Sequence, residues 1–307
     1  MKQLFITSVR DFEKNTMGTV EMREVPMPEP ADDEIRIKII YSSICGSDTH
    51  TLTGHLGEFE EGTKAMLPMT FGHELSGIID KAGAKAEALG YHAGDKVIAN
   101  YAKYCYACEN CRSGHENLCS NVQFCMNGFA EYAVYHVTQV HKLPENYDLE
   151  TAALIEPLTI ALAAAEQAHI SYGKSVAIMG AGGIGLMLVQ LARLAGASCV
   201  TVFDLVEEKC ELAKQLGADY AFDPRKEGAI DEAIKAAGGL YDCVLEGTGV
   251  VSSAETALKL LARNGDGVYF AMYGKDPYLQ VNLHTDFYWD QKHLHGVIMG
   301  AGLFPKA

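Results

Sequence analysis

The stretch that decides the fold of this chain is Ser175-Val176-Ala177-Ile178-Met179-Gly180-Ala181-Gly182-Gly183-Ile184-Gly185, an apolar run followed by a glycine-rich loop. The loop matches the pattern G-x-G-x-x-G. Glycine triplets occur in many turns, so the loop alone is a weak signal. Here it follows a run typical of a buried strand and opens a run typical of an apolar helix, which is the context of a dinucleotide-binding turn. The sequence therefore predicts a strand, a phosphate-binding loop and a helix over 175–195.

Each glycine of this loop has a physical role in that prediction. Gly180 permits the tight turn, Gly182 lets the backbone approach a pyrophosphate, and Gly185 lets the helix pack closely on the strand. The start of the helix, at Gly183 and Ile184, offers free N–H groups and the positive end of the helix dipole to the phosphates. We therefore expect this loop to bind a dinucleotide.

The next apolar run ends at Asp204. A carboxylate about 20 residues beyond the loop is placed to accept the ribose hydroxyls. A 2′-phosphate would meet this carboxylate with no arginine beside it, because the next residue is Leu205. The sequence therefore favours NAD over NADP, and Lys209, the nearest base, is expected to cap the adenosine ribose.

Strand-like and helix-like runs alternate from residue 175 onward, which predicts βαβ units and a parallel sheet. The predicted strands are 175–179, 199–203, 220–222, 241–245 and 267–272, and the predicted helices are 184–195, 207–216, 229–237 and 251–261. Residues 150–169 are rich in Ala, Leu and Ile and predict one or two helices that precede this region.

The N-terminal half has a different pattern, with many short strands and turn signals, which suggests a barrel-like β domain. Its predicted strands are 35–41, 76–80, 96–100 and a pair within 129–140. The sequence therefore predicts an α/β protein of two domains: a β-barrel domain over 1–155, and a doubly wound parallel-sheet domain over 156–307.

Composition and charge exclude several classes of function. The chain has 307 residues, a formal net charge of −15, 48% hydrophobic and 21% charged residues. This acidic balance argues against a nucleic-acid or an anionic-membrane surface. The N-terminus lacks a signal-peptide pattern, and no apolar run reaches the ~20 residues of a membrane span. We expect a cytoplasmic protein that holds an anionic cofactor with local backbone donors.

Four of the nine cysteines are clustered with the spacing C-x2-C-x2-C-x7-C. They are Cys105, Cys108, Cys111 and Cys119. In a long chain without secretion signals, such clustering favours metal over disulfides. Four thiolates close a tetrahedron, so we expect a structural zinc ion within a lobe at 100–120. The remaining cysteines apart from Cys45 are interpreted as small apolar fillers, and these are Cys125, Cys199, Cys210 and Cys243.

A catalytic zinc needs a different set, with three protein ligands and one open position. Cys45 and His73 supply a thiolate and an imidazole, and Glu74 and Glu156 compete to supply the carboxylate. Zinc with one thiolate, one neutral imidazole and one carboxylate is neutral overall, whereas a second carboxylate would weaken its power to acidify a bound alcohol. We therefore expect one glutamate to bind directly and the other to lie behind it or to bind only during exchange.

Such a site oxidises an alcohol by hydride transfer to the nicotinamide, and the released proton needs a route to water. Ser47 lies two residues after Cys45, and His50 follows. We expect Ser47 to take the proton through a hydrogen bond and His50 to pass it to solvent. A turn serine and a surface histidine are the alternative interpretations of these two residues.

These motifs together resemble the zinc-dependent medium-chain dehydrogenase/reductase family. They are Cys45-Gly46-Ser47-Asp48, Gly72-His73-Glu74-x2-Gly77-x5-Gly83, Gly94-Asp95-Lys96-Val97, the four-cysteine lobe, Glu156-Pro157-Leu158 and the 180–185 loop. The resemblance implies a GroES-like catalytic domain, a Rossmann domain, NAD(P)-linked alcohol oxidation and a homodimer or homotetramer. Glu156 stands where liver-type alcohol dehydrogenases carry a cysteine, so the chain is more similar to the sorbitol, butanediol and threonine dehydrogenase branch. That branch implies a polyol or secondary alcohol as substrate.

The resemblance also implies further site residues. Ile184, Asp204 and Lys209 would line the adenosine side. Residues 271–273 around Met272, and 297–299 around Val297, would face the nicotinamide. A predicted strand at 295–301 would pair across a dimer axis, and residues 51–69, including His55, Phe59 and Met66, would contribute to the pocket entrance.

Relatives fold a C-terminal segment back onto the catalytic domain, whereas this chain ends at Ala307. A second hypothesis is therefore a catalytically impaired protein that binds zinc and NAD. A zinc-free reductase of the quinone type is a third, which the His73-Glu74 pair and the cysteine lobe oppose.

Overall fold

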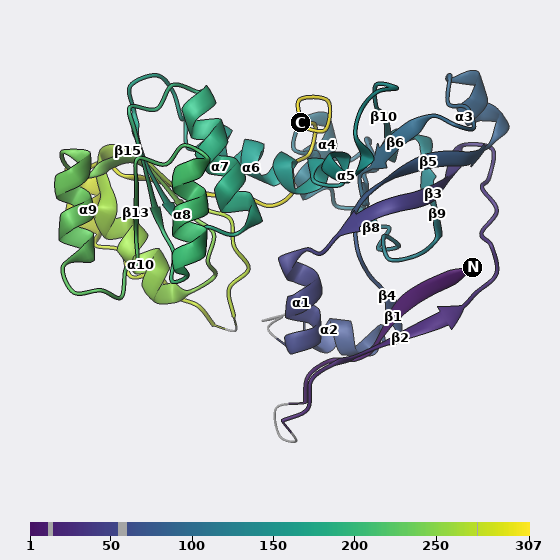
Figure 1. Cartoon of the computed structure of the whole chain (residues 1–307), viewed down its shortest axis with the longest axis horizontal. Helices are drawn as coiled ribbons and strands as arrows, with labels where there is room; N and C mark the ends of the chain where they lie inside the picture. The colour runs from purple at the N-terminus through teal and green to yellow at the C-terminus, as the bar shows by residue number, and fades with distance from the viewer. Residues whose placement is uncertain (12–14, 55–59, 275) are drawn as a thin grey trace. The chain divides into compact units, whose positions relative to one another are not determined.

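The computed structural model describes residues 1–11, 15–54, 60–274 and 276–307 and divides the chain into two compact units (Figure 1). Unit 1 comprises Met1–Thr159 and Gly300–Ala307, and unit 2 comprises Ile160–Met299. This division falls later than the predicted boundary after residue 155, and it returns the last residues to unit 1. The reason is packing: a Cβ on Gly300 would lie 2.3 Å from the Thr159 side chain, and Phe304 is buried in one cluster with Ile98 and Ile155.

The core of unit 1 is a five-stranded antiparallel sheet of order β10-β6-β5-β3-β9. Its strands are β3 (Glu34–Ser43), β5 (Glu74–Ala82), β6 (Lys96–Ala99), β9 (Tyr132–His136) and β10 (Val140–Lys142). The alternation predicted for 35–41 is present, because Ile35 and Ile37 are fully buried while Lys38 is exposed. Successive side chains on a strand point to opposite faces, so this pattern buries one face of the sheet.

A second sheet of unit 1 has the order β2-β1-β4. Its strands are β1 (Lys2–Ser8), β2 (Thr19–Glu24) and β4 (Met69–Thr70). Hydrogen bonds from Leu4 N to Phe129 O (2.9 Å) and from Glu131 N to Lys2 O (3.1 Å) join β1 to the segment that enters β9. The two sheets therefore curve into the half-barrel of a GroES-like domain, as predicted.

Short elements complete unit 1. They are α1 (Gly46–Thr53), α2 (Glu60–Ala65), α3 (Ala84–Ala88), β7 (Ala102–Lys103), α4 (Glu109–Arg112), β8 (Gln123–Phe124), α5 (Leu149–Ala152) and 3₁₀ turns at Glu116–Leu118 and Val137–Gln139. The predicted 150–169 helical region is two helices, α5 and α6 (Ile155–Gln167). Sequence patterns did not predict α1, which begins directly after Cys45.

Unit 2 is built on a six-stranded parallel sheet of order β13-β12-β11-β14-β15-β16 (Figure 1). Its strands are β11 (Ser175–Met179), β12 (Cys199–Phe203), β13 (Tyr220–Phe222), β14 (Tyr241–Glu246), β15 (Leu261–Tyr269) and β16 (His293–Gly296). Its helices after α6 are α7 (Gly183–Leu194), α8 (Glu207–Gln215), α9 (Ala229–Ala237) and α10 (Val251–Leu260), with a π-helical segment at Leu283–Trp289. The strand order reverses between β11 and β14, which is the switch point of the doubly wound Rossmann fold.

Helices cover both faces of this sheet. Ala177 and Met179 of β11 pack in one cluster with α9 and α10. Ile178 points to the opposite face, where it approaches Gly185 of α7. The strand predicted before the glycine loop is therefore present, and it is buried on both faces.

The last predicted strand, 295–301, is wrong in its bounds. Strand β16 spans His293–Gly296 and pairs in parallel with β15. The chain leaves the extended conformation soon afterwards, because Met299 has a positive φ of 57°. Among the predicted pocket residues, His55 and Phe59 lie outside the described residues, and Met66 is exposed just beyond α2. In the described part of the chain, every helix is too short or too polar to cross a bilayer.

Candidate active site and metal centres

The glycine loop joins β11 to α7 in the predicted manner. Gly180 has a φ of 98°, a region that favours glycine, and a Cβ on Gly185 would lie 2.0 Å from Gly180 O. By contrast, a Cβ on Gly182 or Gly183 would meet no heavy atom within 4 Å. The first and third glycines of the pattern are therefore required by the fold itself. The open space at Gly182 and Gly183 is where a pyrophosphate would approach the backbone.

Asp204 lies directly after β12 and contacts this loop. Its Oδ2 accepts a hydrogen bond from Ala181 N at 2.7 Å, and its Oδ1 accepts one from Val206 N at 2.9 Å. Both carboxylate oxygens are thus fixed at the carboxyl edge of the sheet, where ligands bind in open α/β folds. Lys209 is exposed on α8.

An arginine that sequence proximity did not reveal lies near Asp204. Arg225 donates from Nη2 to Leu205 O at 2.9 Å. The same guanidinium is paired with Asp223, with Nη2 at 2.7 Å from Asp223 Oδ2. Its positive charge is therefore already matched by a carboxylate.

The two residues predicted to face the nicotinamide follow neighbouring strands. Met272 comes after β15 and is partly exposed, and its carbonyl oxygen would lie 2.5 Å from a Cβ on Gly249. Val297 comes directly after β16 and donates from its N–H to Tyr269 O at 3.1 Å. Both thus lie at the carboxyl ends of parallel strands, the edge that also carries the glycine loop.

Within unit 1, the structure brings three of the four predicted catalytic ligands together. One ligand atom each of Cys45, His73 and Glu74 lies within 4.8 Å of the others. His73 and Glu74 are buried, and Cys45 is half-buried. A thiolate, an imidazole and a carboxylate at this spacing form the kind of set that binds zinc with an open fourth position.

The backbone around His73 explains how these groups converge. Gly72 has a φ of 82°, and a Cβ on Gly128 would lie 2.7 Å from Gly72, so this turn is tightly enclosed. Glu74 opens β5 and pairs in register with Ser43 at the end of β3. The Ser43 hydroxyl donates to the Glu74 carboxylate, which fixes its orientation. Cys45 follows β3 two residues later, so the β3–β5 pair delivers both ligands.

Asp48 is a site residue to which sequence reasoning assigned no role. It is buried on α1, and its Oδ2 accepts from Cys45 N at 3.0 Å while its Oδ1 accepts from Gly72 N at 3.3 Å. Its Oδ1 also lies 3.9 Å from His73 Nδ1. The signal available in the sequence was its spacing, because a carboxylate three residues after the N-cap residue can accept a hydrogen bond from the N-cap N–H, as Asp48 does from Cys45.

Glu156 lies in the first turn of α6 and is buried. It is not one of the three residues whose ligand atoms meet within 4.8 Å. Burial raises the pKa of Glu156 to about 8, and the negative charges of Glu74 and Asp48 add to this effect. Glu156 is therefore close enough to interact electrostatically with the group while lying outside its tightest part.

The chemistry of this group fits a divalent cation. Asp48, Glu74 and Glu156 are all buried, and among the described residues none of them forms an ion pair with lysine or arginine. Burial raises the pKa of Cys45 to about 12, reinforced by the charge of Glu74, and burial lowers the pKa of His73 to about 4. His73 Nδ1 is buried with no hydrogen-bond partner in the described chain. Buried acidic groups are costly without a compensating charge, and a bound metal would supply it.

The predicted proton-relay residues follow Cys45 on α1. Hydrogen bonds from the Ser47 hydroxyl and N–H oppose the rise in the pKa of Cys45, which places Ser47 beside the sulfur. His50 is half-buried one turn further along the same helix, and residues three apart share a helix face. Tyr101, which the sequence did not indicate, places its ring 4.7 Å from the His73 ring. Burial, followed by the charge of Glu156, raises the pKa of Tyr101.

The four clustered cysteines form a second group within unit 1. The sulfur atoms of Cys105, Cys108, Cys111 and Cys119 lie within 4.8 Å of one another. Cys105 and Cys111 are 3.9 Å apart and Cys108 and Cys119 are 4.0 Å apart, far longer than a disulfide bond. A zinc ion with Zn–S bonds near 2.3 Å needs S···S distances of about 3.8 Å. The four sulfurs therefore fit a closed tetrahedral site.

Backbone N–H groups point at these sulfurs. Cys108 N donates to Cys105 Sγ at 3.3 Å, and Asn121 N donates to Cys119 Sγ at 3.4 Å. Hydrogen bonds from Ala107 and Cys108 lower the pKa of Cys105 to about 6. The lobe is closed by the antiparallel pair of β7 and β8. Of the cysteines interpreted as fillers, Cys210 and Cys243 are buried, and Cys125 and Cys199 are half-buried.

Comparison with known proteins agrees with this geometry. Residues 31–145 match the family described as alcohol dehydrogenase GroES-like domain, and residues 183–307 match the family described as zinc-binding dehydrogenase. The chain is 31% identical to sorbitol dehydrogenase of Bacillus subtilis, over 94% of this chain and 81% of that protein. It is 32% identical to (R,R)-butanediol dehydrogenase of Saccharomyces cerevisiae, over 83% of this chain and 74% of that protein.

Solved structures are similar as well. A zinc-binding dehydrogenase from Clostridium scindens is 68% identical with a TM-score of 0.98, covering 100% of this chain and 87% of that one. A zinc-binding dehydrogenase from Sinorhizobium meliloti bound to NADP is 27% identical with a TM-score of 0.87, covering 99% and 86%. An alcohol dehydrogenase from Escherichia coli bound to NADH is 25% identical with a TM-score of 0.84, covering 100% and 86%. The chain therefore belongs to the zinc-dependent medium-chain dehydrogenase/reductase family of alcohol dehydrogenases.

Proposed function

We propose that this protein oxidises a secondary alcohol or polyol to a ketone with zinc and NAD. The single observation that carries the proposal is the close group of half-buried Cys45 with buried His73 and Glu74. This group has the donor types of a catalytic zinc site, and the buried acidic residues around it have no lysine or arginine partner among the described residues. A cytoplasmic location and a homodimer or homotetramer complete the proposal, by resemblance to the family.

Glu74 is the third zinc ligand in this proposal, and Glu156 lies behind it. Two observations support this assignment. Glu74 shares the 4.8 Å group with Cys45 and His73, and its carboxylate is oriented by Ser43. Glu156 interacts with the same group through charge, as expected of a residue that binds only when the open position is exchanging.

Different residues bind the metal, position the backbone and transfer the proton. When bound, zinc would supply a Lewis acid to the alcohol oxygen, and NAD would supply the hydride acceptor. Cys45, His73 and Glu74 hold the metal, and Asp48 holds the backbone on both sides of it. Ser47 takes the hydroxyl proton, and His50 passes it to water.

The nucleotide is held by unit 2. The open backbone at Gly182 and Gly183 binds the pyrophosphate, and Asp204 accepts hydrogen bonds from the ribose hydroxyls. NAD is preferred because a 2′-phosphate would be repelled by Asp204, while the charge of Arg225 is matched by Asp223. Ile184 and Lys209 line the adenosine side, and Met272 and Val297 lie on the nicotinamide side.

In the closed lobe, Cys105, Cys108, Cys111 and Cys119 hold a structural zinc ion. This site has no open position, so its role is to order residues 100–120. Two zinc ions in unit 1 follow, one in each group.

A polyol or diol is the proposed substrate class, since the curated relatives named above are a sorbitol and a butanediol dehydrogenase. The test is NAD reduction, followed at 340 nm, across a panel of polyols, diols, primary alcohols and amino alcohols. We expect secondary alcohols within polyols or diols to give the highest kcat/KM. Absence of NAD reduction across the panel, by protein that retains both zinc ions, would instead support the impaired zinc- and NAD-binding protein.

A further inference from the structure

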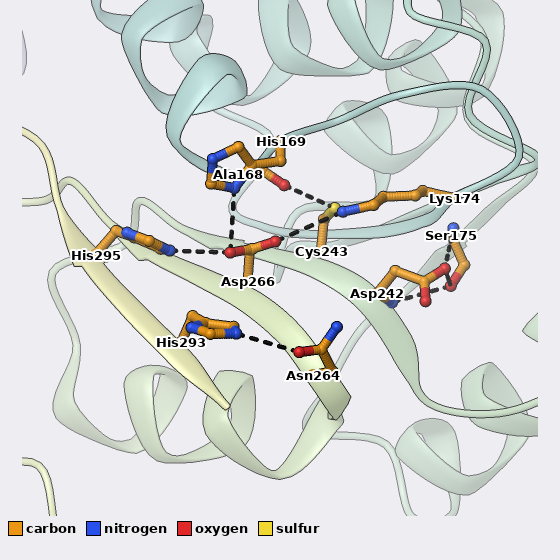
Figure 2. A network of polar contacts seen from close by, with 10 residues as sticks. All are labelled: Ala168, His169, Lys174, Ser175, Asp242, Cys243, Asn264, Asp266, His293 and His295. Atoms are coloured by element: carbon orange, nitrogen blue, oxygen red, sulfur yellow. Dashed lines mark hydrogen bonds and ion pairs between the residues drawn. The ribbon is translucent and has the colours of Figure 1, made fainter. Parts of the chain in front are cut away.

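A third cluster of metal-binding side chains lies in unit 2, near the start of β11 and away from the carboxyl edge that carries the glycine loop. Figure 2 shows His169, Asp266 and His295 pointing toward one another from three different segments. His169 Nδ1 lies 3.2 Å and His295 Nε2 lies 3.0 Å from the same atom, Asp266 Oδ1. One ligand atom from each residue lies within 4.8 Å of the others.

The backbone holds these three residues in place. Asp266 and His295 are on adjacent parallel strands, β15 and β16, and Asp266 pairs in register with His293. Asp266 therefore reaches His295 diagonally across the ladder. His169 follows Ala168, which is fully buried and whose carbonyl accepts from Cys243 Sγ at 3.0 Å. The Asp266 side chain is 9% exposed, whereas His169 is 64% exposed, so the cluster has a buried base and a side open to solvent.

The spacing suits a tetrahedral ion. Metal–ligand bonds of 2.0–2.1 Å, as zinc makes to imidazole and carboxylate, separate neighbouring ligand atoms by about 3.3 Å. The two N···O distances in this cluster, 3.2 and 3.0 Å, are close to that value. The second carboxylate oxygen of Asp266 lies 3.5 Å from Lys174 Nζ, which orients the carboxylate in the manner of an outer-shell partner.

We propose that His169, Asp266 and His295 bind a divalent transition-metal ion, zinc by preference, at a site separate from the two zinc sites of unit 1. Two imidazoles and one carboxylate are the donor set that zinc and its neighbours in the transition series select. Solvent fills the remaining coordination on the exposed side. The bound ion links the loop that enters β11 to β16 and stabilises unit 2.

Without metal the same atoms form a hydrogen-bonded network. His295 Nε2 donates to Asp266 Oδ1, because a carboxylate only accepts, and His169 Nδ1 lies 3.2 Å from the same oxygen. Metal binding replaces these contacts and requires each imidazole to present a lone pair to the ion. Lys174 opposes the ion by its charge. Its side chain is 30% exposed and can turn toward solvent.

The test is calorimetric titration of zinc into the full chain, after the unit 1 sites have been loaded and free zinc has been removed by dialysis. The wild type should bind one more zinc per chain than His169→Ala and Asp266→Asn. His169 is exposed, so His169→Ala keeps the fold intact even if Asp266→Asn does not. His293→Ala is the matched control, since His293 lies on the same strand but contacts Asn264, and it should bind like the wild type.

The zinc affinity of Lys174→Met provides a second measurement. If His169, Asp266 and His295 formed only a hydrogen-bonded network, this substitution would not change zinc binding. Removal of the nearby positive charge should tighten zinc binding at least several-fold. Saturating zinc should also raise the Tm of the wild type and of His293→Ala, but not that of His169→Ala. Equal zinc uptake by the wild type and His169→Ala would overturn the proposal, whatever the occupancy of the unit 1 sites.

Discussion

Asp48 Oδ1 lies 3.9 Å from His73 Nδ1, while the same carboxylate accepts hydrogen bonds from Cys45 N and Gly72 N. One buried side chain therefore holds the residue before α1 and the turn before β5, which carry two of the three proposed zinc ligands. At 3.9 Å the Asp48 carboxylate acts on the His73 imidazole through its charge, because His73 Nδ1 has no hydrogen-bond partner among the described residues. The two segments are far apart in the sequence, and this carboxylate fixes their spacing.

Asp48→Asn should weaken binding of the catalytic zinc. The amide keeps the shape but loses the negative charge near His73, and its NH2 group cannot accept one of the two backbone hydrogen bonds. Loss of an outer-shell partner typically costs ~10–100-fold in metal affinity. The measurement is the rate at which a chelator removes zinc, together with kcat. Thr49→Ala, which changes an exposed neighbour on α1, is the control. Zinc loss at the wild-type rate from Asp48→Asn would contradict this role.

Replacing Glu74 and Glu156 one at a time should show which of them is the third zinc ligand and which lies behind it. Glu74→Gln should remove the catalytic zinc and lower activity by at least ~100-fold, more than an outer-shell change. Glu156→Gln should keep both zinc ions of unit 1 and lose less activity, because Glu156 lies outside the 4.8 Å group. Metal analysis of both purified variants decides the assignment. The reverse pattern of zinc retention would make Glu156 the ligand.

Sequence patterns pointed to several residues that the structure brings together, because each of them belongs to a recognisable short motif. The glycine loop predicted β11 and α7, and the cysteine spacing predicted the lobe, since both depend on residues close along the chain. Asp48 and Tyr101 were not recognised because their roles come from contacts with residues of other segments. The same reason applies to Arg225, which approaches Leu205 only once β12 and β13 lie side by side.

One domain boundary and one ligand assignment could not be predicted for a related reason. The return of Gly300–Ala307 to unit 1 depends on the close contact of Gly300 with Thr159, which no local pattern encodes. The choice between Glu74 and Glu156 depends on distances of a few ångströms between segments. Local sequence propensity gives neither this contact nor these distances.

Alanine at Gly182 should affect NAD binding, whereas alanine at Gly185 should affect the stability of unit 2. Gly182→Ala should leave the Tm unchanged, because its Cβ meets nothing within 4 Å, yet raise the KM for NAD. The added methyl group would hold the pyrophosphate away from the backbone N–H groups, and loss of one hydrogen bond to a charged group costs about 1.5–3 kcal/mol, or roughly 10–100-fold. Gly185→Ala should destabilise unit 2 by at least ~1–3 kcal/mol through overpacking against Gly180 O. Thermal melts and NAD titrations give the two readouts, and a lowered Tm in Gly182→Ala would contradict the assignment of free space.

Asp204→Ala should shift cofactor preference. Loss of the ribose hydrogen bonds should raise the KM for NAD roughly 10-fold or more, and loss of the negative charge should improve the use of NADP. The measurement is kcat/KM with each cofactor. Arg225→Ala is the control for the neighbouring cation and should leave the KM for NAD nearly unchanged. A wild-type preference for NADP would contradict the role given to Asp204.

The most direct test of the account is the zinc content of Cys45→Ser compared with the wild type, measured on dialysed protein together with NAD reduction by the best polyol of the panel. Cys45→Ser should contain one zinc ion fewer per chain than the wild type, keep the four-cysteine zinc and show no NAD reduction above background. An unchanged zinc content, or NAD reduction that persists in Cys45→Ser, would contradict a catalytic zinc held by Cys45, His73 and Glu74.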